Sequence, residues 1–286
     1  MILVTGATGK NGTELGKLLA SRNIPFRAMV RSTDRTTELA TAAGVELVVG
    51  DFDDKASIER ALRGIERAFL LTNSTERAEE QQRGFVATAG RTGLKHIVKL
   101  SQFAADEASP VRFLRYHAAV ERAIIESGMA YTFIRPNLFM QGLLGFSQSV
   151  KAEGRFFAAA GDAKISVVDV RDNAAVAAAA LTRLGHEGRT YTLTGPAALT
   201  HAEMAAGLSE ATGHPIAFVD VPPEAMRDAL LGMGMPPSQA DGLVEDYAHY
   251  RRGEAASVAS GVQDATGQMP RPFAAFARDY ASAFER

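Results

Sequence analysis

Three glycines near the start of the chain are spaced so that they can hold a diphosphate. Gly6, Gly9 and Gly12 follow the apolar run at residues 2–5 and precede a helical pattern with leucines on one side. Gly6 permits a tight strand-to-helix turn, Gly9 lets the backbone approach a pyrophosphate, and Gly12 allows the helix to pack closely. Free N–H groups at the helix start then face the phosphates. Such triplets also occur in ordinary turns, but the strand-turn-helix context favours a nucleotide site.

The residue after the second predicted strand favours one class of dinucleotide. Arg31 ends that strand about 20 residues beyond the glycines, where an NAD-binding chain usually has an acidic residue for the ribose hydroxyls. A guanidinium at this place can pair with the 2′-phosphate of NADP. Ser32 and Arg35 can assist, whereas Asp34 opposes this reading, and the alternative is a solvated surface arginine. The pattern therefore predicts NADP(H) as the cofactor.

Further cofactor contacts are expected in the turn and at the ends of the later strands. Asp51 can accept from the adenine amino group, and Phe52 can lie against the base; Asp53 and Asp54 are expected to cap the next helix instead. Ser101 and Gln102 are expected to face the nicotinamide pocket, with the alternative that they only cap a loop or helix. The remaining expected contacts are Thr8, Lys10, Asn11, Thr72, Asn73, Ser74, Pro136 and Asn137.

These residues need an alternating series of strands and helices to bring them together. Strands are expected at residues 2–5, 26–30, 46–49, 67–71, 96–100 and 131–135, with helices at 12–22, 36–43, 55–62, 76–92 and 112–127. Such alternation predicts βαβ crossovers and a parallel sheet covered on both faces. The fold class is therefore α/β, a doubly wound Rossmann sheet.

After Asn137 the pattern loosens. Strands are expected at 164–168 and 189–193, and helices at 173–184, 200–212 and 223–231. We expect residues 1–137 to form the nucleotide-binding domain, with returning segments near 164–184. Residues 138–286 are expected to form a small α/β substrate domain that caps the carboxyl edge of the sheet.

Composition narrows the classes of partner. The 286 residues carry a formal net charge of −2 and no cysteine, so the chain offers no basic surface for nucleic acid and no thiolate chemistry. The six histidines are dispersed, without the paired spacing of a metal site. No apolar run approaches a membrane span and no secretory leader is evident, so we expect a cytoplasmic protein without a membrane partner. The composition leaves open a monomer or a homodimer.

Several runs together resemble the NmrA-like branch of the atypical short-chain dehydrogenases/reductases, which includes triphenylmethane reductases and type 2 quinone oxidoreductases. The matching runs are TGATGKNG at 5–12, VR at 30–31, GD at 50–51, GLKHIV at 93–98, LS at 100–101, residues 117–121, SGMAYTFIRPN at 127–137, VVDVRD at 167–172 and YTLTG at 191–195. The resemblance implies a Rossmann domain, a small substrate domain and NADP(H) binding.

The helix that resembles the catalytic helix of that family departs from its usual pattern. Short-chain dehydrogenases typically use a Tyr-x-x-x-Lys pair, but here Tyr116 has Val120 four residues on. By the same resemblance, His117 stands where related reductases carry the lysine or the tyrosine. It is our candidate catalytic residue, either binding a ribose hydroxyl or relaying a proton. The alternative is a structural histidine that pairs with Glu121 one turn away.

The resemblance implies an NADPH-dependent reductase that transfers hydride to a flat apolar acceptor, such as a quinone, an azo or triarylmethane dye, or an enone. Because the nicotinamide performs the chemistry, the missing Tyr/Lys pair is compatible with this activity. The alternative is a non-enzymatic NADP(H)-binding redox sensor that reports to a partner protein. A sugar-nucleotide epimerase ranks last, because its chemistry depends on the missing tyrosine.

Overall fold

A seven-stranded parallel sheet lies at the centre of the protein. The computed structural model describes residues 1–32, 41 and 43–285, and its strand order is β3-β2-β1-β4-β5-β6-β8. This order defines the doubly wound Rossmann fold and confirms the predicted class. The strands are β1 Ile2–Val4, β2 Phe26–Val30, β3 Val45–Val49, β4 Arg67–Leu70, β5 His96–Leu100, β6 Ala130–Pro136 and β8 Arg189–Leu193.

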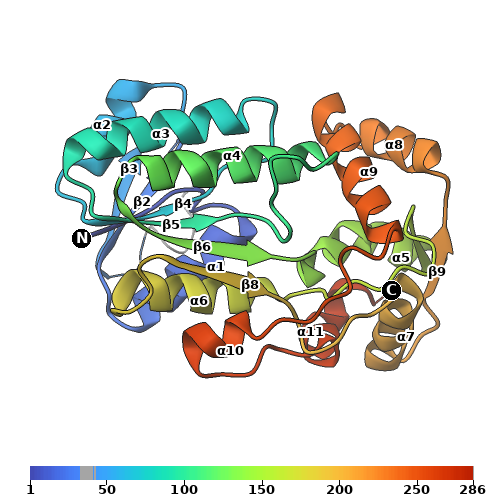
Figure 1. Cartoon of the computed structure of the whole chain (residues 1–286). Coiled ribbons are helices and arrows are strands. Elements are labelled where there is room, and N and C mark those ends of the chain that lie inside the picture. The colour runs from blue at the N-terminus through green and yellow to red at the C-terminus, as the bar shows by residue number, and fades with distance from the viewer. Residues whose placement is uncertain (33–40, 42, 286) are drawn as a thin grey trace.

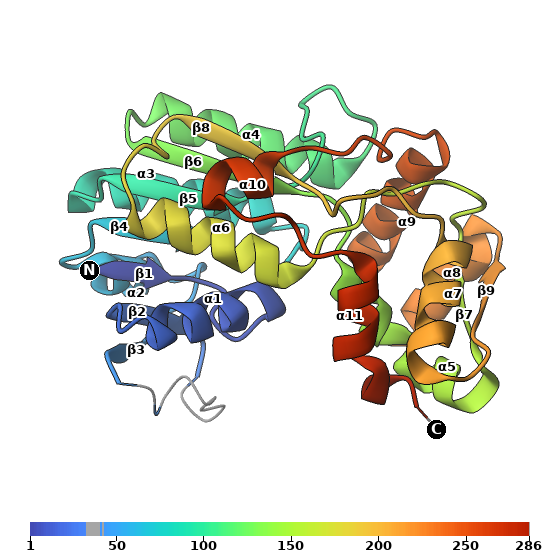
Figure 2. The same cartoon turned by 90° about the horizontal axis from the view of Figure 1, so that it is seen from below.

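Helices cover both faces of this sheet, as Figures 1 and 2 show. One face carries α2 Lys55–Leu62, α3 Ala78–Thr92 and α4 Arg112–Glu126, and the other carries α1 Lys10–Ser21, α6 Val170–Thr182 and α10 Gly261–Thr266. The central strands are therefore buried on both sides, which explains their continuous apolar runs. In β5 every residue is buried, including Lys99.

The alanine-rich run of the second half forms α6, which packs directly on α1. Ala174, Ala177 and Ala178 are buried in the same apolar cluster as Leu15 and Leu19 of α1. Small side chains let the two helix backbones approach closely. The end of the glycine-rich turn is also tied to this segment, since Asn11 accepts from Asn173, 162 residues further along the chain.

The rest of the second half forms a smaller α/β unit with its own apolar core, which includes Phe156, Leu208 and Phe276. Its two-stranded parallel sheet pairs β7 Arg155–Ala158 with β9 Ala217–Asp220. Figure 1 shows this unit beside the carboxyl ends of the main strands. Its helices are η2 Met140–Phe146, α5 Ser147–Glu153, α7 His201–Thr212, α8 Pro223–Gly232, α9 Pro237–Arg251, α11 Phe273–Asp279 and η3 Ala281–Ala283.

Two features of this second half differ from expectation. The predicted strand at 164–168 is wrong, because the segment makes only isolated bridges, Ile165 with Leu199 and Val168 with Phe139. Ser166 donates to the carbonyl of Ser257 at 2.7 Å, so the segment threads between neighbours without a continuous strand partner. The sequence analysis also missed β7 and β9, which are only four residues each. The predicted helix at 36–43 falls largely outside the described residues.

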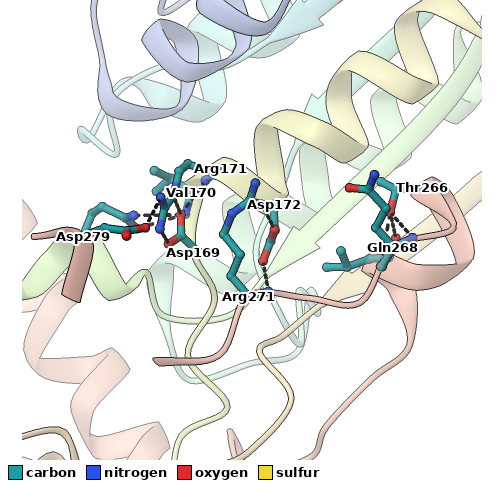
Figure 3. Close-up of polar contacts among 10 residues, drawn as sticks. Asp169, Val170, Arg171, Asp172, Thr266, Gln268, Arg271 and Asp279 are labelled. Atoms are coloured by element: carbon teal, nitrogen blue, oxygen red, sulfur yellow. Dashed lines mark hydrogen bonds and ion pairs between the residues drawn. The ribbon is translucent and has the colours of Figure 1, made fainter. Parts of the chain in front are cut away.

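Charged side chains fasten the last part of the chain to the start of α6 (Figure 3). Arg171 donates to Asp169 at 2.7 Å and to Asp279 at 2.6 Å. The backbone N–H of Arg271 donates to Asp172 at 2.8 Å, and its guanidinium pairs with the same carboxylate. These contacts hold the carboxyl-terminal segment beside the main sheet, so α11 and the smaller unit keep a fixed position next to the cavity described below.

Candidate active site

A cavity of about 770 Å³ lies along the carboxyl ends of the parallel strands. Ligands of open α/β sheets bind at this edge, where the strand order reverses between β1 and β4. Residues that follow β1 to β6 line the cavity, and α9 closes one end. Because β3 and β2 lie on one side of β1 while β5 and β6 lie on the other, Arg31 and Asp51 mark one end of the cavity and Ser101 and Pro136 the other.

The glycine-rich turn has the geometry that a diphosphate needs. Gly6 has φ +62°, and the N–H of Gly9 donates to its carbonyl at 3.0 Å. A Cβ at Gly12 would lie 2.2 Å from the carbonyl oxygen of Gly6, so only glycine lets α1 begin this close to the turn. No side chain in the described part of the protein caps α1, which leaves its first amides free for an anion. The turn therefore fits the diphosphate of a dinucleotide.

The structure brings together sixteen of the seventeen predicted cofactor residues. Only Gly12 is outside the cavity lining, because it lies behind the turn. The sixteen are Gly6, Thr8, Gly9, Lys10, Asn11, Arg31, Asp51, Phe52, Thr72, Asn73, Ser74, Ser101, Gln102, His117, Pro136 and Asn137. Their shared position supports the assignment, and their contacts with the cofactor remain a prediction.

Two polar side chains of the turn are engaged within the protein. The ammonium of Lys10 donates to the carbonyl of Gln141 at 2.8 Å, and partial burial lowers its pKa. The side-chain oxygen of Asn11 accepts from Asn173 at 3.0 Å. Both contacts join the turn to the second half of the chain. We therefore expect these residues to contact a diphosphate mainly through their backbone N–H groups.

At the adenine end, Arg31 is exposed and lines the cavity, so its guanidinium can reach a ligand phosphate. Arg35, also expected to assist, lies outside the described residues. Asp54 caps α2 by accepting from the amides of residues 56 and 57, as predicted. The same prediction for Asp53 is wrong, because its carboxylate accepts from Arg77 at 2.7 Å and from Gln81 at 3.0 Å.

At the other end, several predicted residues already have protein partners. Asn137 donates to Ser166 at 2.8 Å and to the carbonyl of Ala255 at 2.9 Å, so its amide fixes the cavity wall. Gln102 donates to Asp246 on α9 at 3.0 Å. In contrast, the buried hydroxyl of Ser101 has no hydrogen-bond partner in the described part of the chain. Ser101 is therefore available to a bound group.

His117 does not pair with Glu121. Glu121 is buried and pairs instead with Arg135 from β6. The Nδ1 of His117 lies 2.7 Å from the ammonium nitrogen of Lys99, a fully buried lysine on β5. The alternative, a structural histidine paired with Glu121, is therefore wrong, because the ring is buried and Lys99 occupies its Nδ1.

Burial sets the charges of this pair. Desolvation lowers the pKa of Lys99 to about 7, and the nearby Glu121 opposes that shift. Desolvation, followed by the charges of Lys99 and Arg135, lowers the pKa of His117 well below its ordinary value. His117 is therefore a neutral imidazole whose Nδ1 accepts from Lys99, which leaves Nε2 as its N–H donor. The ring of Tyr116 is tilted by 31° against the His117 ring, with the two centroids 4.1 Å apart, and its hydroxyl donates to or accepts from Ser74 at 3.0 Å.

The sequence analysis missed the residues that α9 and β5 contribute. Leu243, Asp246, His249 and Tyr250 line the cavity from α9, and their spacing of three to four residues is a helical signal that was present in the sequence. Lys99 could have been noticed because it is a lone lysine within the apolar run of β5. Phe113 of α4 also lines the cavity.

The chain belongs to the NmrA-like family, whose model matches residues 1–264. This confirms the resemblance inferred from the motifs. The chain is 39% identical over 284 residues to an NAD(P)H azoreductase of Xenophilus azovorans, with 99% of each chain covered. It is 40% identical over 285 residues to a (4-alkanoyl-5-oxo-2,5-dihydrofuran-3-yl)methyl phosphate reductase of Streptomyces griseus, again with 99% of each chain covered.

Among solved structures, the chain is similar to an NADPH-dependent quinone oxidoreductase of Escherichia coli complexed with NADPH. The TM-score is 0.87 at 27% identity, and the match covers 98% of this chain and 99% of that one. The likeness includes both the main sheet and the smaller unit. Separately, none of the described helices is long and apolar enough to cross a membrane.

Proposed function

We propose that this protein is an NADPH-dependent reductase that transfers hydride to a flat, conjugated acceptor of the azo or quinone type. One observation carries the proposal. The glycine-rich turn, Arg31 and side chains of α9 all line the same cavity, so a dinucleotide and a second compound can be held side by side in it. Full-length relatives at 39% and 40% identity are both reductases by name, which supports the same class of reaction here.

The residues of the cavity suit NADPH along its length. The turn from Gly6 to Gly12 would hold the diphosphate, and the exposed guanidinium of Arg31 would pair with the 2′-phosphate. When bound, the nicotinamide supplies a hydride. The free hydroxyl of Ser101 and the N–H of neutral His117 would hydrogen-bond the cofactor at that end, which orients it toward the acceptor chamber.

The acceptor chamber favours a flat apolar compound. Its walls include the rings of Phe113, Tyr116 and Tyr250 and the side chain of Leu243. Aromatic and aliphatic walls exclude water and stack on conjugated molecules. The acceptor is therefore proposed to lie between the cofactor and α9.

A direct assay tests this function. Purified protein is mixed with NADPH and a panel of quinones, azo dyes and triarylmethane dyes, and the absorbance of the reduced nicotinamide is followed. We expect loss of absorbance with at least one acceptor class. Tight NADPH binding without turnover across the panel would contradict the reductase and favour a redox sensor.

A further inference from the structure

One face of α9 closes the end of the cavity farthest from Arg31. Leu243, Asp246 and Tyr250 recur at spacings of three and four residues and all line the cavity. The helix is held on α4, because the guanidinium of Arg112 donates to Glu245 at 2.6 Å and its backbone N–H donates to the same carboxylate at 2.8 Å. The position of the α9 side chains is therefore fixed with respect to the main sheet.

Asp246 is a buried carboxyl group with one engaged oxygen. Its side chain is only 5% exposed, and its Oδ1 accepts from the amide of Gln102 at 3.0 Å. No described residue bonds to its Oδ2, although the residue lines the cavity. Burial raises its pKa to about 7, and the neighbouring Glu245 adds to the rise. The other ionisable neighbours are Tyr116 on α4 and Tyr247 and Tyr250 on α9.

The other ionisable groups that line this end of the cavity are poor proton donors near neutral pH. Lys99, whose pKa is also lowered to about 7, is fully buried and is not among the lining residues. Burial raises the pKa of Tyr116 and of Tyr250, so both phenols hold their protons. Burial lowers the pKa of His117 and of His249, so neither ring carries an extra proton. Efficient proton transfer needs a group whose pKa lies close to the working pH.

We propose that Asp246 is the acid of this site, bonding through Oδ2 to an oxygen or nitrogen atom of the acceptor and giving it a proton. The inference rests on the proposed reductase function. When bound, NADPH would supply two electrons, as a hydride, to one atom of the acceptor's conjugated system. As a new O–H or N–H bond forms at the acceptor atom that is hydrogen-bonded to Asp246, the O–H bond of Asp246 breaks. The resulting carboxylate then takes up a proton from solvent.

This assignment divides the acceptors into those that need a proton from Asp246 and those that do not. A quinone or an azo compound needs both a hydride and a proton, whereas a cationic triarylmethane dye becomes neutral by accepting a hydride alone. Asp246 is therefore needed for the first group and dispensable for hydride transfer to the second. The same protein can thus report both reactions in one experiment.

The test compares Asp246→Asn with the wild type in the full chain. Asparagine keeps the oxygen that Gln102 binds but cannot release a proton. With menadione and methyl red we expect kcat to fall about 10-fold or more, while kcat for malachite green and the Kd for NADPH stay within about twofold. Because the acid must be protonated, wild-type kcat for menadione should fall as the pH rises through about 7, and this limb should vanish in the variant.

A matched control and a second readout keep the test independent of turnover. Asp228→Asn changes an exposed aspartate on the neighbouring α8 and should alter none of these values. The raised pKa of Asp246 means that the folded state holds its proton above the range where the unfolded state releases it. The Tm of the wild type should therefore fall relative to that of Asp246→Asn as the pH rises from about 5 to about 8, a range that includes this pKa.

Three results would overturn the assignment. The first is an unchanged kcat and pH profile in Asp246→Asn, and the second is a fall of kcat with rising pH that His117→Ala removes and Asp246→Asn retains. The third is a difference in Tm between the wild type and Asp246→Asn that stays constant with pH. A wild type that neither binds NADPH nor reduces any acceptor would instead refute the proposed function. The Tm comparison still decides the protonation of Asp246 in that case.

Discussion

The two ends of the cavity are built by different means. At the diphosphate end, the site is formed mainly by the backbone, because Gly6, Gly9 and Gly12 set the path of the seven residues from 6 to 12. At the acceptor end, the positions of the groups depend on side chains from distant segments, such as Gln102 with Asp246, 144 residues apart. A backbone site tolerates change in its neighbours but not in its glycines. A side-chain site can change its chemistry by single substitutions.

The largest expected effect comes from closing the space at Gly12. In Gly12→Ala the new Cβ would lie 2.2 Å from the carbonyl oxygen of Gly6, so the turn or α1 must shift. We expect the Kd for NADPH to rise about 100-fold or more and the free energy of unfolding to fall by about 1–3 kcal/mol. Calorimetry and urea unfolding measure the two.

The control for that variant is Gly90→Ala in α3, where no atom of the described residues lies within 4 Å of the added Cβ. Since alanine favours helix over glycine, this change should leave NADPH binding intact and preserve or raise stability. Equal NADPH affinity in Gly12→Ala and Gly90→Ala would show that the turn does not hold the diphosphate.

A smaller change of cofactor affinity is expected from Arg31→Ala. Loss of a charged hydrogen bond to the 2′-phosphate should reduce the preference for NADPH over NADH about 10- to 100-fold, with NADH binding little changed. Titration of both nucleotides measures this preference. The control is Arg22→Ala, which removes an exposed arginine after α1. An equal effect in both variants would show that Arg31 is a solvated surface arginine that does not bind the 2′-phosphate.

At the acceptor end, Lys99→Met tests a buried charge. The folded-state pKa of Lys99 lies near 7, below the unfolded value of 10.5, so the ammonium costs stability fully below pH 7, and this cost disappears as the pH rises toward 10.5. Between about pH 6 and pH 9, the free energy of unfolding of the wild type should therefore rise by about 1–3 kcal/mol relative to that of Lys99→Met. Urea unfolding at both pH values measures it.

The exposed Lys95 provides the comparison for that measurement. Lys95→Met should differ from the wild type by an amount that does not change over the same range of pH. If Lys99→Met behaves in the same way, the lysine under His117 is not desolvated as the geometry requires.

The smallest expected effect is at Gly242, where α9 rests on Phe113. A Cβ there would lie 2.3 Å from the ring Cζ, but the ring and the helix can both move, whereas the backbone contact at Gly12 cannot. We expect Gly242→Ala to raise KM for a quinone severalfold, on the order of 1 kcal/mol, while NADPH affinity stays unchanged. A parallel loss of NADPH affinity would mean that the two ends of the cavity are not independent.

The same contrast explains what the sequence predicted. The glycine turn, Arg31 and the alternating strands are local patterns with direct backbone consequences, so the main sheet and one cavity wall followed from them. Lys99 and Asp246 acquire their roles only when β5 meets α4 and when α9 folds back over the sheet edge. No local pattern fixes those long-range contacts. The short β7 and β9 were missed for the same reason, since each depends on its partner more than on its own four residues.

A crystal structure of the protein with NADPH and a non-reducible quinone analogue tests the central claim most directly. The account predicts the diphosphate on the first amides of α1, the 2′-phosphate beside Arg31, and the analogue between the nicotinamide and α9 with an oxygen at hydrogen-bond distance from Asp246. An ordered NADPH elsewhere, or an analogue that lies outside the chamber under α9, would contradict it.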